Sequence, residues 1–209
     1  MARTRDSFFR HKARYAAQPR VLVICEDTKS SRSYLQDASQ YFRANVHVEI
    51  VHSGYTDPKG IVEAALKRVK EFESLYCVVD RDTHENFDAA MRLSRTSGKI
   101  TMIVSHPCFE YWLLLHFNES RKAYVRSGNR SAADCLIVDL RKESGMDGYQ
   151  KGNVARLFQQ LLGERFIAAR LRSPRVLSDA IKVKSMNPST GLHILIDHLE
   201  RLGAPQPSR

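Results

Sequence analysis

The first half of the chain alternates short apolar runs with longer amphipathic segments. The apolar runs are rich in β-branched residues, as expected of strands buried in a sheet. They occupy 21–25, 46–51, 75–79 and 100–104. The segments between them space apolar residues as helices do. These predicted helices cover 29–43, 59–74 and 86–97, and Thr28 is expected to cap the first of them. This order predicts an α/β fold with a mainly parallel sheet flanked by helices.

The character of the sequence changes after Pro107. The segment 109–117 is densely apolar and predicts a buried helix, with Trp112 and Phe117 in the core. From about residue 131 onward the pattern favours helices only. These cover 131–143, 153–171, 174–184 and 189–201. The predicted organisation is therefore a basic arm (1–18), an α/β core (19–118), a C-terminal helical extension packed on that core (119–203) and a tail (204–209).

Charge and cysteine usage narrow the class of protein. The formal net charge of +10 favours a polyanionic partner, because Lys and Arg displace the counterions condensed on phosphates. Charge alone is equally compatible with the absence of such a partner. No cysteine pair has CxxC spacing, and Cys25, Cys77 and Cys108 lie in or beside apolar runs, as buried thiols do. Without a signal peptide or an apolar run long enough to span a membrane, we expect a cytoplasmic protein with no membrane partner.

Three acidic residues follow the ends of predicted strands. Glu26 closes the first strand, Asp80 closes the third, and Asp82 comes two residues later. Ligands of parallel α/β sheets bind at the carboxyl ends of the strands, so the three carboxylates are expected to converge. Such a cluster suits Mg²⁺, which takes a few carboxylates plus waters and can activate a water against a phosphate. Each acid alone could instead cap a helix or pair with Arg81.

Four segments resemble the RloB family, in the order found in that family. They are VLVICEDTKSSRSYL, CVVDRDTHENFDAA, IVSHPCFEYWLLLHF and NPSTGLHILIDHL. The resemblance implies a topoisomerase–primase (Toprim) fold in which Glu26, Asp80 and Asp82 hold divalent metal. It also implies a Mg²⁺-dependent nuclease of bacterial antiviral defence, often encoded with an ATPase partner. The family commonly has Glu-Gly-Glu at its first motif, whereas this chain has Glu26-Asp27-Thr28, which puts a second metal in doubt.

Further residues are candidates for the same site. Glu110 opens an apolar helix and is either a fourth metal ligand or a partner of the helix N-terminus. Lys151 lies in a glycine-flanked loop, which the family shares, where it could neutralise charge in a transition state. Lys29, near a predicted helix N-terminus, could hold a phosphate or be a solvated lysine. Nucleic-acid contacts are also predicted for Arg81, His84, Lys182 and Lys184.

The function predicted from these features is endonucleolytic cleavage of RNA, with transfer RNA as one candidate, or of DNA. Glu26, Asp80, Asp82, Glu110 and Lys151 would form the catalytic site, with Mg²⁺ or Mn²⁺ as the cofactor. The expected partners are nucleic acid and an ATPase, and a homodimer is compatible with the sequence. Two alternatives stay open: a non-catalytic module that uses the acids structurally, and a phosphotransferase or nucleotide-acting enzyme. The phosphotransferase is disfavoured because the chain lacks a GxxxxGK[ST] loop.

Overall fold

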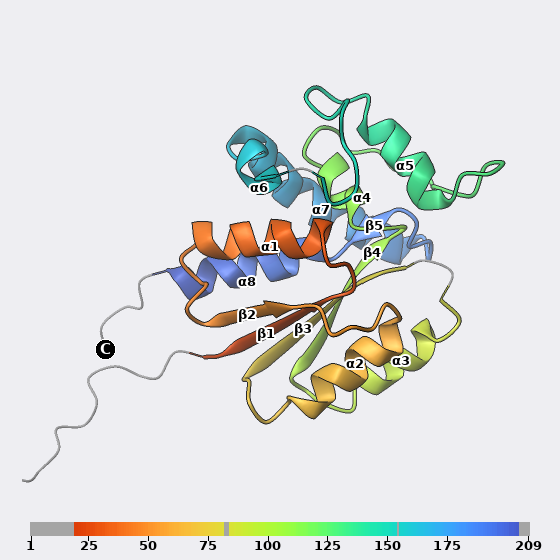
Figure 1. Cartoon of the computed structure of the whole chain (residues 1–209). Coiled ribbons are helices and arrows are strands. Elements are labelled where there is room, and N and C mark those ends of the chain that lie inside the picture. Colours follow the sequence, from red (N-terminus) through yellow and green to blue (C-terminus); the bar gives the residue numbers. More distant parts are fainter. Residues whose placement is uncertain (1–18, 82–83, 154, 205–209) are drawn as a thin grey trace, which may run out of the picture.

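The computed structural model describes residues 19–81, 84–153 and 155–204, and within these ranges a five-stranded sheet forms the centre of the molecule. Its spatial order is β2-β1-β3-β4-β5 (Figure 1). The strands are β1 (Val21–Cys25), β2 (Val48–Val51), β3 (Ser74–Asp80), β4 (Ile100–His106) and β5 (Ser189–Thr190). The first four are parallel, and β5 pairs antiparallel with β4. The predicted mainly parallel α/β sheet is therefore confirmed.

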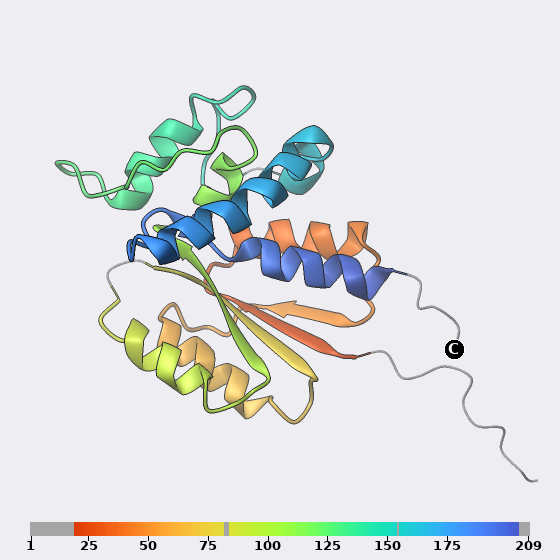
Figure 2. The same cartoon turned by 180° about the vertical axis from the view of Figure 1, so that it is seen from behind.

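Helices cover both faces of this sheet, as the two opposite views show (Figures 1 and 2). One face carries α1 (Ser30–Tyr41) and α8 (Leu192–Gly203), and the other carries α2 (Pro58–Lys67) and α3 (Phe87–Ser94). Alternate residues of each strand supply the two cores, so that Val23 packs under α1 while Leu22 packs against α2. Each fully buried aliphatic side chain contributes about 1.5–3 kcal/mol of burial free energy.

A further layer of helices lies beyond the carboxyl ends of the strands. It contains α4 (Glu110–Leu114), α5 (Ala132–Leu140), α6 (Leu157–Gln160) and α7 (Glu164–Lys182). Trp112 is fully buried and Phe117 packs against the same core, as predicted. Among the described residues, no helix combines the length and the apolar character that a membrane span requires.

The expectation that the C-terminal part is entirely helical is wrong in one element. β5 has two residues, which is too short for a strand period to be visible in the sequence. Its place is set by tertiary contacts, in which Thr190 pairs with Ser105 and their hydroxyls share a hydrogen bond of 2.8 Å. The predicted break before residue 174 is also absent, because α7 continues through Pro174. The neighbouring Ser173 is fully buried and donates a hydrogen bond to the Thr190 carbonyl, which favours the continuous helix.

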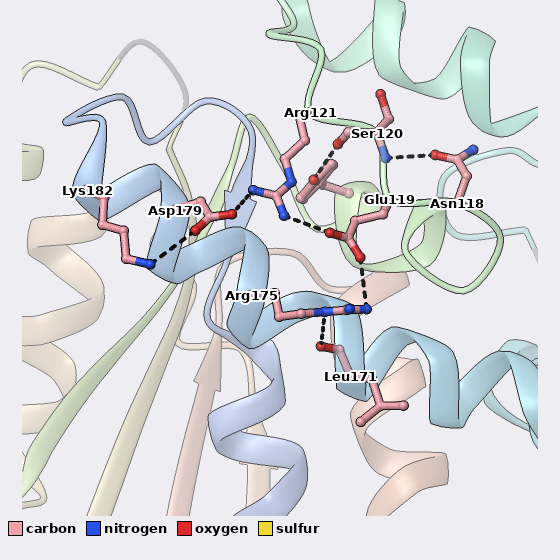
Figure 3. A network of polar contacts seen from close by, with 9 residues as sticks. Asn118, Glu119, Ser120, Arg121, Leu171, Arg175, Asp179 and Lys182 are labelled. Carbon is pink, nitrogen blue, oxygen red and sulfur yellow. Dashed lines mark hydrogen bonds and ion pairs between the residues drawn. The ribbon is translucent and has the colours of Figure 1, made fainter.

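The segment that follows α4 is attached to α7 by a network of ion pairs (Figure 3). Arg121 bridges Glu119 and Asp179, while Arg175 contacts Glu119 at 3.0 Å and Lys182 contacts Asp179 at 3.5 Å. These side chains are partly or largely exposed, so solvent screens each of the ion pairs and each stabilises the fold only weakly. Their shared effect is to fix the start of the helical layer against α7.

Candidate metal centre

The predicted convergence of Glu26 and Asp80 is present in the structure. Glu26 directly follows β1, Asp80 ends the adjacent parallel strand β3, and the Glu26 amide donates to the Val78 carbonyl at 3.0 Å. The Asp80 amide in turn donates to Glu26 Oε2 at 2.8 Å. Adjacent parallel strands thus bring together two acids that are 54 residues apart in sequence. Asp82, the third predicted ligand, lies outside the described residues.

Glu110 joins this pair from the first turn of α4. Asp80 Oδ1 accepts a hydrogen bond of 2.9 Å from the Phe109 amide, which holds the start of α4 beside the end of β3. Ligand atoms of Asp80, Cys108 and Glu110 all lie within 4.8 Å of one another. Burial, and then the charge of Glu110, raise the pKa of Asp80 well above its ordinary value. The raised pKa identifies Asp80 as a carboxylate whose negative charge is poorly compensated by the protein alone.

Glu110 is only 1% exposed, and two residues of the helical layer contact its carboxylate. The Tyr149 hydroxyl donates to Oε1 at 2.9 Å, and Lys151 Nζ lies 3.3 Å from Oε2 as an ion pair. Partial burial lowers the pKa of Lys151, but the neighbouring negative charges, above all Glu110, outweigh it and the pKa is raised. Lys151 is therefore a stable ammonium beside Glu110, and its catalytic role stays a prediction.

The loop that carries Tyr149 and Lys151 is fixed from two sides. Arg141 donates to the Tyr149 carbonyl at 2.7 Å, and the Gly152 amide donates to the Ser30 hydroxyl at 3.0 Å. Gly152 has a φ of +76°, and a Cβ there would lie 2.4 Å from the Lys29 side chain. Only glycine fits that conformation and that close approach. The loop therefore places Lys151 in the centre and packs against the stem of Lys29.

The start of α1 differs from the prediction, because Lys29 is the N-cap residue and the side chain that accepts from the first amides lies two residues earlier. Asp27, not Thr28, accepts hydrogen bonds from the first amides, with distances of 2.6 Å to Lys29, 2.6 Å to Ser30 and 2.8 Å to Ser31. A carboxylate satisfies several unpaired amides and also interacts favourably with the positive end of the helix, which explains why it is preferred to a hydroxyl. Both oxygens of Asp27 thus accept hydrogen bonds from the N-terminus of α1.

A pocket of about 390 Å³ opens onto this centre. Its walls come from the loops that follow β1, β2 and β4 and from the Lys151 loop. The lining residues are Glu26, Asp27, Thr28, Lys29, Ser30, His52, Thr56, Asp80, Phe109, Glu110 and Lys151. His52 and Thr56 were not predicted, because a lone polar residue after β2 carries no motif. The His52 Nδ1–H donates to the Cys25 carbonyl at 3.1 Å, which leaves Nε2 as the nitrogen that can act on a ligand.

The predicted nucleic-acid contacts separate into two groups. His84 lies at the centre, where its Nε2 is 3.3 Å from Glu26 Oε1, and Lys29 lines the pocket. Arg81 instead stacks on the Phe87 ring at 3.9 Å and is not part of the pocket lining. Lys182 and Lys184 are exposed at the end of α7, also outside that lining. Their role in binding nucleic acid stays a prediction.

The donor set fits a divalent cation that prefers oxygen. Glu26, Asp80 and Glu110 supply carboxylates, and the only cation among the described residues that pairs with Glu110 is Lys151. Mg²⁺ and Mn²⁺ are bound by such oxygen ligands together with waters. Burial and the charge of Glu110 raise the pKa of Cys108 well above its ordinary value, so its thiol stays protonated and is a poor ligand for Mg²⁺.

Comparison with known proteins identifies the family. The model of the family described as RloB-like protein matches residues 21–199. This range includes all five strands of the sheet and every described residue of the candidate centre. No curated protein and no solved structure matches the chain. The chain therefore belongs to the RloB-like family.

Proposed function

We propose that this member of the RloB-like family is a metal-dependent nuclease with a Toprim-type centre. The observation that carries the proposal is the convergence of Glu26, Asp80 and Glu110, from three separate elements, on one pocket with Lys151 at its edge. Buried like charges are costly without a cation, so they are seldom found outside functional sites. Asp82 is a further expected ligand, from the sequence alone.

The carboxylates of Glu26, Asp80 and Glu110 would hold Mg²⁺ or Mn²⁺. When bound, such an ion polarises a phosphate oxygen and lowers the pKa of a water ligand. The residues of the chain then act on the substrate directly. Lys151 places a fixed positive charge next to the negative charge that develops on the phosphate. Lys29 lines the same pocket and supplies a second cation for the phosphate backbone.

His84 and His52 complete the polar walls of the pocket. His84 contacts Glu26 and so orients that carboxylate. His52 has its Nδ1–H committed to the Cys25 carbonyl, so in the neutral ring Nε2 is a proton acceptor. A water held between His52 and the scissile phosphate would transfer its proton to this nitrogen.

The biological setting follows from the family resemblance. We propose that the chain cuts RNA or DNA in the bacterial cytoplasm during antiviral defence, and that an ATPase encoded alongside controls it. The net charge of +10 is in keeping with a polyanionic substrate.

One observation favours a second candidate, a non-catalytic binding module. Lys151 already neutralises part of the acidic cluster through its contact with Glu110, so these charges could serve structure alone. In that case nucleic acid would bind in a salt-sensitive manner without cleavage, and loss of Asp80 would leave binding unchanged.

The experiment that separates the two is a cleavage assay with labelled total RNA, single-stranded DNA and duplex DNA. The parent and Asp80→Asn are compared with Mg²⁺, Mn²⁺ or a chelator, with and without the candidate ATPase. Metal-dependent cutting by the parent, lost in Asp80→Asn, supports the nuclease. Binding without cutting under every condition supports the module.

A further inference from the structure

Cys108 stands next to the two most deeply placed acids of the centre. Asp80 ends β3, Glu110 opens α4, and Cys108 lies in the short connection from β4 to α4. One ligand atom from each lies within 4.8 Å of the other two. Cys108 is 2% exposed, and it was expected only as a buried thiol of the core.

The state of Glu110 provides independent evidence that a ligand belongs here. Its side chain is 1% exposed, yet Oε2 has no hydrogen-bond partner among the described residues. Its one charged contact among the described residues is the ion pair with Lys151 Nζ at 3.3 Å. The charge of this buried oxygen is therefore compensated by a single half-exposed ammonium, and coordination to a cation would compensate it more fully.

The donor set differs from a magnesium site by its sulfur. Two carboxylate oxygens and one thiolate suit a borderline or soft divalent ion of the Zn²⁺ or Cd²⁺ class, because such ions bind thiolate strongly and Mg²⁺ does not. We infer that Asp80, Cys108 and Glu110 form a site for a thiophilic divalent ion. This site shares Asp80 and Glu110 with the proposed magnesium centre, so the two ions exclude each other.

Binding proceeds by exchange of a proton for the ion. The Cys108 S–H bond breaks, a sulfur–metal bond forms, and the proton is released to solvent, so that no oxidant or reductant is needed. Sulfur and oxygen ligands on tetrahedral Zn²⁺ are about 3.5 Å apart. The ligand atoms lie within 4.8 Å of one another, so each pair must approach by at most about 1.3 Å to reach that separation. Lys151, whose side chain is 48% exposed, can turn into solvent to admit the ion.

The consequence is a metal-selective response of the proposed nuclease. An ion held partly by Cys108 removes two carboxylates from the reaction and compensates their charge, so traces of Zn²⁺ or Cd²⁺ inhibit the magnesium-dependent reaction. The existence of the site itself does not depend on cleavage, because it requires only the three ligands. Asp80 and Glu110 line the pocket through which an ion would enter, whereas Cys108 is buried and is not part of that lining.

The test is a Cd²⁺ titration of metal-free protein, followed by the ultraviolet charge-transfer band that forms when thiolate binds Cd²⁺. The parent is compared with Cys108→Ser and with Cys135→Ser, the matched control at a partly exposed thiol. We expect the band in the parent and in Cys135→Ser, and its loss in Cys108→Ser with an affinity for Cd²⁺ weaker by about tenfold or more. A full band in Cys108→Ser, or no band in the parent, overturns the proposal.

Two further measurements distinguish loss of the site from misfolding of the variant and from failure of the proposed nuclease. The ¹¹³Cd NMR spectrum of the unaltered protein distinguishes a sulfur-containing ligand set from one of oxygens alone, so a folding defect of Cys108→Ser cannot decide the result. A resonance typical of oxygen ligands alone contradicts the site. Glu26→Ala should keep the Cd²⁺ band while losing cleavage, which separates a failure of this site from a failure of the proposed nuclease.

Discussion

Lys151 is the residue whose replacement should change metal affinity and catalysis in opposite directions. Its ammonium lies 3.3 Å from Glu110 Oε2. An ion bound by that oxygen at about 2.1 Å would lie on the order of 5 Å from the ammonium. Repulsion between a single and a double positive charge at that separation is about 1.7 kcal/mol in water and about 7 kcal/mol at an effective dielectric constant of 20. Because the Lys151 side chain is half exposed, we use the lower value, which corresponds to an affinity change of about tenfold.

Lys151→Met removes the charge and shortens the side chain by only one atom. We expect it to bind Mn²⁺ about tenfold more tightly than the parent at low ionic strength, as measured by calorimetry on metal-free protein. Cleavage should nevertheless fall by about 100-fold or more, because the positive charge beside the scissile phosphate is lost. The control is Lys142→Met, an exposed lysine that is absent from the pocket lining. Unchanged or weaker Mn²⁺ binding by Lys151→Met would refute the placement of this ammonium at the metal centre.

Three other outcomes are expected. The first concerns the pH dependence of stability in the presence of a chelator. Above pH 3.8 the unfolded chain releases the Asp80 proton, whereas the folded state keeps it up to its raised pKa. The free energy of unfolding therefore falls as pH rises from 3.8 to that raised pKa. Urea titrations across pH should show that Asp80→Asn reduces this fall, and an equal slope in the variant would contradict the raised pKa. Gly152→Ala should cost about 1–3 kcal/mol in the same assay, because the residue has a positive φ and no room for Cβ, whereas Gly148→Ala, with open space around it, should cost little. Tyr149→Phe should cost about 1–3 kcal/mol through the loss of its hydrogen bond to buried Glu110, and a stability equal to the parent would show that this bond is unimportant.

The sheet and part of the site could be predicted because local patterns determine them. The runs that became β1, β3 and β4 are apolar enough to be recognised as buried strands, and the rule for parallel sheets then placed Glu26 and Asp80 at one edge. The prediction that Glu110 and Lys151 belong to the same centre rested on the family resemblance and on the glycines of the loop. Their direct contact required the structure.

The features that sequence could not supply depend on contacts between distant segments. β5 is defined by its pairing with β4, and two residues carry no period. Asp27, not Thr28, accepts from the amides at the start of α1 because three of them converge on one carboxylate, which only the backbone geometry reveals. Cys108 and His52 were missed for the same reason, since a single polar or thiol residue becomes informative only when its neighbours are known.

The most direct test of a metal-dependent nuclease is cleavage of labelled total RNA and DNA by metal-free protein to which Mn²⁺ is added back. The parent, Glu26→Gln and Asp80→Asn are assayed side by side, with the candidate ATPase present, after each variant is shown to unfold cooperatively. We predict cutting of one nucleic-acid class by the parent, dependent on the added ion and reduced at least about 100-fold in both variants. Equal cutting by the parent and both variants, or cutting that persists in chelator, would contradict a catalytic metal centre at these residues.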